Sequence, residues 1–128
     1  MDDSYNASPA SMKAALDVFK GLTGKHHIAV LADMKELGEN YLEYHREVGE
    51  YAANSGVDLV VTLGEASKCL AEGARAVKDI PVVEFLDCDE MVKYLEREVC
   101  DGDCVLFKGS NSMGLSAVAD KFAEMAGK

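Results

Sequence analysis

A lysine, a glycine and three small polar residues stand where an apolar segment gives way to a helix-like pattern. Lys108 and Gly109 follow the apolar run 104–107, and Ser110, Asn111 and Ser112 come next. A helix that begins here would direct unpaired backbone N–H groups and the positive end of its dipole toward the turn, to which Lys108 adds a full charge. These groups suit a carboxylate or a phosphate. A well-capped turn with an exposed lysine is the simpler alternative.

Two further polar segments could share a site with this turn. The segment Asp33–Asn40 follows the apolar run His27–Ala32, and Asp3–Ser8 precedes the first helix-like pattern. In a parallel sheet, the loops that follow the strands meet at one edge, where ligands bind. Gly64-Glu65 and Asp87–Asp89 belong to the same edge. The turns at the opposite edge, Gly21–His26 and Asp101–Asp103, are interpreted as structural.

The elements that position these loops alternate along the chain. Ser8 can cap a helix that has Pro9 in its first turn and ends at Gly21 to Gly24, and later helices begin near Asn40, after Gly64, and at Asp87 or Asp89. The third helix is expected to turn Ala66, Cys69, Leu70, Ala74 and Val77 inward, and a closing helix carries Leu115, Val118, Ala119, Phe122 and Met125 on one side. The strands are His27–Ala32, Asp58–Leu63, Val82–Leu86 and a last one that ends at Lys108. This order predicts an α/β, Rossmann-like, doubly wound and mostly parallel sheet with helices on both faces.

Composition narrows the classes of partner. The 128 residues fit one domain, and a net charge of −10 argues against a nucleic-acid surface and against anionic membranes. No apolar run approaches the roughly 20 residues of a membrane span, and the acidic start Met1-Asp2-Asp3 differs from a signal peptide, so we expect a cytoplasmic protein. The four cysteines are expected to be reduced, partly buried thiols, and a zinc site on Cys100 and Cys104 is disfavoured.

Several other chemistries lack their motifs. The sequence contains no G-x-x-x-x-G-K-[ST], no G-x-G-x-x-G and no G-x-S-x-G. His26 and His27 are adjacent and would point to opposite sides of a strand, which disfavours a metal site on the pair. His45 is expected to be a solvated or partly packed histidine. A phospho-accepting receiver domain is an alternative, but Asp58–Leu63 ends without the aspartate that it needs.

Three motifs together resemble the C-terminal domain of the Mur ligases, over essentially the whole chain. They are 2–9 (DDSYNASP) with 11–16 (SMKAAL), 31–38 (LADMKELG) and 108–113 (KGSNSM). The resemblance implies an excised domain, residues 1–128, of a three-domain ATP-dependent ligase that forms amide bonds in peptidoglycan synthesis. The N-terminal and central ATPase domains would lie outside this chain, which agrees with its abrupt start and missing P-loop.

The motifs are most similar to those of the family member that adds D-alanyl-D-alanine to UDP-N-acetylmuramoyl-tripeptide through an acyl phosphate. In that family ATP and Mg²⁺ are bound mainly by the central domain, and the implied contribution of this chain is to bind the incoming amine and close over ATP. By motif, Asp3, Tyr5 and Asn6 would meet ATP. The residues implied to face D-alanyl-D-alanine are Asp33, Met34, Glu36, Leu37, Lys108, Gly109, Ser110, Asn111 and Ser112. The resemblance implies neither a metal site nor a complete catalytic centre within this domain alone.

The sequence departs from the family pattern at two positions. Ala32 stands where glycine is common, and Asn111 stands where arginine is common. Without the guanidinium, bidentate recognition of a carboxylate is lost at that position. A cyanophycin- or folylpolyglutamate-type ligase domain remains an alternative within the same class.

Overall fold

The structure is a computed structural model that describes residues 8–35 and 37–109. Helices and strands alternate along the described chain: α1 (Pro9–Lys20), β1 (His27–Ala32), α2 (Tyr41–Ala53), β2 (Leu59–Leu63), α3 (Ser67–Val77), β3 (Val82–Phe85), α4 (Cys88–Glu98) and β4 (Cys104–Lys108). The four strands form one sheet in the order β3-β2-β1-β4, and all neighbouring pairs are parallel. The predicted α/β class with a doubly wound parallel sheet is therefore confirmed.

The strand order reverses beside β1. The chain steps from β1 to β2 and on to β3, and then crosses back through α4 to place β4 on the other side of β1. In the register, Leu31 faces Lys108 across the β1–β4 pair, while Ala32 faces Leu63 across the β1–β2 pair. The ends of these three strands therefore meet at one edge, beside the point of reversal where ligands bind in open α/β sheets.

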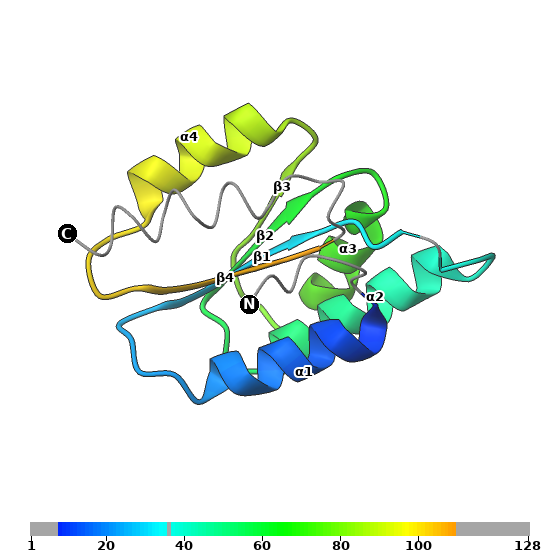
Figure 1. Cartoon of the computed structure of the whole chain (residues 1–128), viewed down its shortest axis with the longest axis horizontal. Helices are drawn as coiled ribbons and strands as arrows, with labels where there is room; N and C mark the ends of the chain where they lie inside the picture. The colour runs from blue at the N-terminus through cyan, green and yellow to red at the C-terminus, as the bar shows by residue number, and fades with distance from the viewer. Residues whose placement is uncertain (1–7, 36, 110–128) are drawn as a thin grey trace.

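The helices cover both faces of the sheet (Figure 1), with α1, α2 and α3 on one side and α4 on the other. Alternate residues of β1 serve the two layers: Ala29 and Leu31 pack with the three-helix side, and Ile28, Val30 and Ala32 with α4. Because strand side chains alternate between faces, a strand covered on both sides must be apolar throughout. This explains the continuous apolar run that marked β1 in the sequence.

Two glycines bring α2 and α3 into close contact. A Cβ atom built on Gly49 of α2 would lie 1.9 Å from the carbonyl oxygen of Leu70, and one on Gly73 of α3 would lie 2.3 Å from the carbonyl oxygen of Arg46. Each helix therefore presents its glycine to the backbone of the other. This packing fixes α3 relative to α2.

Most predicted element boundaries are confirmed. The Ser8 side chain accepts a hydrogen bond from the Ser11 N–H in a capping box, Pro9 opens α1, and β1 has the predicted bounds. One expected inward position was wrong, because Val77 is 40% exposed at the last residue of α3. The predicted strand Val82–Leu86 ends one residue earlier, at Phe85, and Leu86 is 59% exposed. Helical periodicity and strand propensity do not predict burial reliably at the last residue of an element, where the chain leaves the packed layer. The expected closing helix lies outside the described residues.

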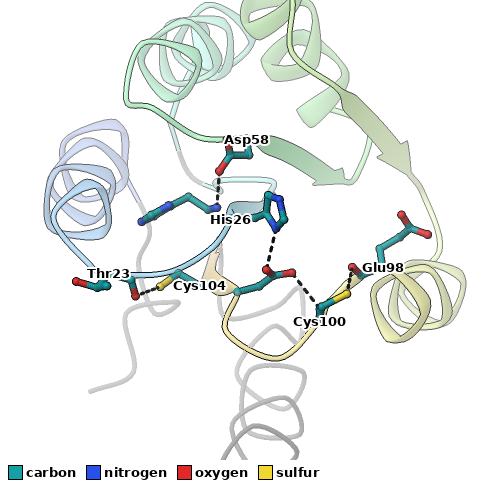
Figure 2. Close-up of polar contacts among 8 residues, drawn as sticks. Thr23, His26, Asp58, Glu98, Cys100 and Cys104 are labelled. Atoms are coloured by element: carbon teal, nitrogen blue, oxygen red, sulfur yellow. Dashed lines mark hydrogen bonds and ion pairs between the residues drawn. The ribbon is translucent and has the colours of Figure 1, made fainter.

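The opposite edge of the sheet is held by short polar contacts between turns (Figure 2). A carboxylate oxygen of Asp103 lies 3.0 Å from His26 Nδ1, and the other accepts the Cys100 N–H at 3.0 Å, while Asp58 accepts the His27 N–H at 2.8 Å. Burial raises the pKa of Asp103, but the hydrogen bonds from Cys100 and His26 outweigh it, and the net pKa lies below its ordinary value. The contacts of Asp103 with His26 and of Asp58 with His27 join segments distant in sequence, and they support the structural interpretation of this edge.

The cysteines are free thiols in the described structure. Cys104 Sγ donates to the Thr23 carbonyl at 3.0 Å, and Cys100 Sγ contacts the Glu98 carbonyl at 3.7 Å, so the two thiols have different partners (Figure 2). Three cysteines are partly buried as expected, whereas Cys100 is exposed. The expectation of partial burial was wrong at Cys100, because this residue lies in the turn between α4 and β4.

Candidate functional site

The carboxylate of Asp33 holds the start of α3. Asp33 directly follows β1, and its Oδ1 accepts the Ser67 N–H at 2.8 Å and the Ser67 hydroxyl at 2.7 Å, while Oδ2 accepts the Ala66 N–H at 3.4 Å. The α3 N-cap residue, Ala66, has no side chain that could make this bond. Asp33 therefore caps the helix from another strand, and its negative charge lies at the positive end of the helix dipole.

A glycine makes room for this carboxylate. Gly64 has φ +119, and a Cβ atom there would lie 2.4 Å from the Asp33 carboxyl group. Asp33 itself is only 6% exposed. The end of β2, the start of α3 and the first loop residue after β1 thus form one packed unit.

The next residue of the loop is held by a buried histidine. The Met34 N–H donates to His45 Nε2 at 2.9 Å, and His45 Nδ1 lies 2.6 Å from the Tyr41 carbonyl oxygen. His45 has no exposed surface, and Met34 is 3% exposed. The expectation of a solvated or partly packed histidine was wrong, because the loop folds back over the first turns of α2 and covers the ring.

A cavity of about 600 Å³ lies beside this loop. One wall comes from the loop and the start of α2, and the other from the start of α3. Its lining residues are Asp33, Met34, Lys35, Leu37, Gly38, Tyr41, Leu42, Glu65, Ala66, Lys68 and Cys69. Gly38 has φ +83, which favours glycine where the loop turns toward α2. Apolar surface with a few charged groups at its margin is typical of a pocket for a small ligand.

The charges around the cavity are mixed. Lys68 Nζ lies 3.8 Å from Glu65 Oε2, and both side chains are more than half exposed. Such an exposed pair contributes little to stability, so both groups remain available to a charged ligand. Lys35 adds a second cation. The cavity can therefore accommodate a small molecule that carries both charges.

The end of β4 lies on the other side of β1. Lys108 is 4% exposed, so this lysine is buried rather than exposed on a turn. A Cβ atom on Gly109 would lie 2.7 Å from the Ala32 Cβ. Glycine at 109 thus accommodates the alanine that stands at 32. Among the described residues, neither Lys108 nor Gly109 lines the cavity.

The structure brings together only part of the predicted site. Asp33, Met34 and Leu37 share the cavity. Asp3, Tyr5, Asn6, Glu36 and the run 110–112 lie outside the described residues. The predicted arrangement, with the Lys108 turn opposite the Asp33–Gly38 loop, stays a prediction; the wall that the described residues place opposite this loop is the start of α3.

Sequence reasoning missed three residues of this site. Ser67 donates hydrogen bonds to the Asp33 carboxylate, His45 accepts one from the Met34 N–H, and Lys68 borders the cavity. The position of Ser67 shortly after Gly64 was a usable signal, because a serine at the first residue of a helix can bind a carboxylate delivered by a neighbouring strand. His45 precedes Val48, Gly49 and Ala52 of α2 at helical spacing, so its place on the buried face of the helix was a usable signal as well.

The fold and the cavity define a parallel α/β domain with a ligand-sized site at the carboxyl edge of its sheet. A model of the family "Mur ligase, glutamate ligase domain" matches residues 1–111. The chain belongs to the Mur ligase family as its C-terminal domain, and the family membership sets aside the receiver alternative.

The chain is similar over nearly its whole length to one part of several larger ligases. It is 32% identical to the UDP-N-acetylmuramoyl-tripeptide–D-alanyl-D-alanine ligase of Bacillus subtilis, over 97% of this chain and 28% of the relative, and 40% identical to that of Haemophilus influenzae, over 92% and 26%. A crystal structure of MurF from Acinetobacter baumannii matches with a TM-score of 0.80 and 27% identity, over 96% of this chain and 27% of that one. MurF ligase from Thermotoga maritima in complex with ADP matches with a TM-score of 0.75 and 29% identity, over 97% and 27%. The chain thus spans little more than a quarter of these relatives.

Within residues 8–35 and 37–109, none of the helices combines the length and the apolar character that a membrane span requires. No group of three or more His, Cys, Asp or Glu side chains in these ranges is placed to hold a metal ion.

Proposed function

We propose that this chain acts as the amine-binding domain of a cytoplasmic ATP-dependent ligase that joins D-alanyl-D-alanine to UDP-N-acetylmuramoyl-tripeptide. Residues 1–128 would form one domain of a three-domain enzyme, with the N-terminal and central domains supplied in cis. The observation that carries the proposal is the Asp33–Gly38 loop, which matches the family motif and borders the cavity at the carboxyl edge of the sheet. The similarity to UDP-N-acetylmuramoyl-tripeptide–D-alanyl-D-alanine ligases over 92–97% of this chain supports the choice of substrate.

The proposed reaction forms one amide bond at the expense of ATP. The tripeptide carboxylate takes the γ-phosphoryl group, which gives an acyl phosphate and ADP. The dipeptide amine then attacks the acyl carbon, the carbon–oxygen bond to phosphate breaks, and the amine loses a proton. ATP and Mg²⁺ would be held mainly by the central domain, with Asp3, Tyr5 and Asn6 near the nucleotide. The described chain holds the amine in place, which accelerates a two-substrate reaction by removing the cost of bringing the reactants together.

The charges at the cavity support a zwitterionic dipeptide. Oδ1 of Asp33 already accepts two short hydrogen bonds, whereas among residues 8–35 and 37–109 the only hydrogen bond to Oδ2 is the longer one of 3.4 Å, so Oδ2 is the oxygen that can receive an ammonium group. Glu36 is a second acceptor in the same proposal. Lys35 and Lys68 lie at the margin of the cavity and could receive the carboxylate. Met34 and Leu37 would contact the alanine methyl groups.

The end of β4 forms the other part of the proposed site. Lys108, Gly109 and the run 110–112 would approach the dipeptide carboxylate when the domain closes over ATP. The close contact of Gly109 with Ala32 fixes the chain at this turn, and Asn111 would supply an amide in place of the guanidinium common in the family. Domain closure would assemble the site and exclude water from the acyl phosphate.

A domain fusion tests the complete activity. This chain would replace the corresponding part of the Haemophilus influenzae ligase, and the unaltered ligase would serve as the positive control. We expect amide formation and ADP release with D-alanyl-D-alanine, and neither with L-alanyl-L-alanine. A fusion that folds and binds ATP but forms no amide with D-alanyl-D-alanine would contradict the proposal.

A titration of the chain itself tests the binding site. Amide NMR signals from Lys35, Gly38 and Lys68 should shift on addition of millimolar D-alanyl-D-alanine, and much less with the L,L isomer. The chain should show no micromolar affinity for ATP by itself, because the central domain would supply most of the nucleotide contacts. Micromolar ATP binding to the chain alone would count against this division of roles.

A further inference from the structure

The His45 ring forms hydrogen bonds with two backbone groups, one of which is a donor and the other an acceptor. The Met34 N–H can only donate and the Tyr41 carbonyl can only accept, and they lie 2.9 Å from Nε2 and 2.6 Å from Nδ1. The ring has no exposed surface, so water does not replace either partner. A fully buried side chain that bonds a loop backbone, rather than other core side chains, acts on the position of that loop.

The two partners determine the protonation of the ring. Nε2 must keep its lone pair to accept from Met34, and Nδ1 must carry the proton to donate to Tyr41. Only the neutral ring with hydrogen on Nδ1 satisfies both groups. The other neutral form would place two hydrogens face to face at Met34 and two lone pairs face to face at Tyr41, which leaves both buried backbone groups unpaired.

Hydrogen bonds fix two adjacent residues of the loop, Asp33 and Met34. Asp33 is anchored to Ser67 at the start of α3, and Met34 is anchored to His45 in α2. After these anchors the chain passes Lys35 and turns at Gly38, both at the wall of the cavity. The position of that wall therefore depends on the His45 ring, although His45 itself does not line the cavity.

We propose that His45 is a positioning residue for the ligand site: its neutral ring, with hydrogen on Nδ1, holds the Met34 backbone and thereby sets the cavity wall that meets the amine substrate. The part concerning the amine substrate rests on the proposed function. The part concerning the loop does not.

The tests use two amide variants of the 128-residue chain. In His45→Gln, the side-chain carbonyl can reach the place of Nε2 and accept from Met34. In His45→Asn, the shorter amide reaches only the place of Nδ1 and can serve Tyr41, so Met34 loses its acceptor. Both variants remove the imidazole, and they differ in which of its two hydrogen bonds they can replace.

The first measurement is amide hydrogen exchange at Met34, compared with Val61 in the centre of β2. Loss of one buried hydrogen bond corresponds to roughly a tenfold change in exchange rate. We expect Met34 to exchange about tenfold faster in His45→Asn than in His45→Gln, after division by the rate at Val61. Equal acceleration at both amides would indicate general destabilisation and would overturn the positioning role.

The second measurement is made on the unaltered chain and does not depend on how the variants fold. Long-range ¹⁵N–¹H couplings within the His45 ring should report hydrogen on Nδ1 and a lone pair on Nε2 at neutral pH. Hydrogen on Nε2, in a neutral or a doubly protonated ring, would overturn the proposal.

The third measurement connects the loop to the ligand. The D-alanyl-D-alanine shifts at Lys35 and Gly38 should persist in His45→Gln and weaken several-fold in His45→Asn. If Met34 is released in His45→Asn but the dipeptide shifts are unchanged, the role in ligand positioning is refuted. If the unaltered chain shows no dipeptide shifts, the proposed substrate is contradicted, while the ring tautomer and the Met34 exchange still decide whether His45 positions the loop.

Discussion

Replacement of Asp33 by alanine should destabilise the chain substantially, because the carboxylate is a structural cap as well as a proposed ligand contact. Ser67 has no exposed surface, and Asp33→Ala removes the acceptor for both its N–H and its hydroxyl. Loss of a helix cap costs about 0.5–2 kcal/mol, and an unsatisfied buried donor costs about 1–3 kcal/mol. Since these contributions overlap, we expect a loss of about 2–4 kcal/mol, a large fraction of the stability of a typical domain.

Urea unfolding followed by circular dichroism measures this loss, provided that the dependence on urea concentration has the same slope in each variant. Asp33→Asn keeps an acceptor oxygen for Ser67 but lacks the charge, and it should lose about 1 kcal/mol. Glu65→Gln is the matched control, because Glu65 borders the same cavity with a side chain 81% exposed; we expect a change within about 0.5 kcal/mol.

The stability of the Asp33 variants separates a structural role of the carboxylate from a role in ligand binding. If Asp33→Ala unfolds within about 0.5 kcal/mol of the unaltered chain, the carboxylate does not hold α3, and a role in ligand binding alone would explain its place in the motif. If stability falls as expected while the dipeptide shifts of Asp33→Asn are retained, the residue is purely structural.

Two further predictions concern the scaffold. Gly49→Ala should lower the free energy of unfolding by about 1–3 kcal/mol or more, because its methyl group would meet the Leu70 carbonyl oxygen at 1.9 Å. Gly21→Ala is the control, because Gly21 has φ −84 and the nearest atom to an added Cβ lies at 3.6 Å. It should be neutral or slightly stabilising in the same urea experiment. Similar values for the two variants would mean that α2 and α3 do not pack as closely as the structure has them. The lowered pKa of Asp103 predicts a contribution to stability that depends on pH. This contribution is fully present above the pKa of the unfolded chain, near 3.8, and is lost as the pH falls through the lower pKa of the folded chain. As the pH is lowered from about 5 to about 2, the free energy of unfolding should therefore decrease less steeply for Asp103→Asn than for the unaltered chain. Parallel decreases would refute the contribution of the contacts with His26 and the turn after α4.

The sequence determined the order of elements because the signals involved are local. The Ser8 cap with Pro9, the apolar run of β1 and the stop at Asn54 each depend on a few neighbouring residues, and each matches the structure. Alternation of strand and helix then leaves few topologies, since parallel crossovers are right-handed. The motif 31–38 also marked the loop that borders the cavity.

The tertiary structure decided what the polar side chains of that loop do. Asp33 and Ser67 are separated by 34 positions, and Met34 and His45 by 11, with a loop turn between them, so no local residue pattern indicates either contact. The same carboxylate could bind a ligand or a helix end, and the pairing of β1 with β2, with Gly64 leaving room for the carboxylate, brings Ser67 to it. Because Ser67 is buried, its N–H and hydroxyl must find an acceptor within the protein, and Asp33 provides it. The sequence therefore determined where a site could form, and the packing of distant segments determined which of its residues support the site and which line it.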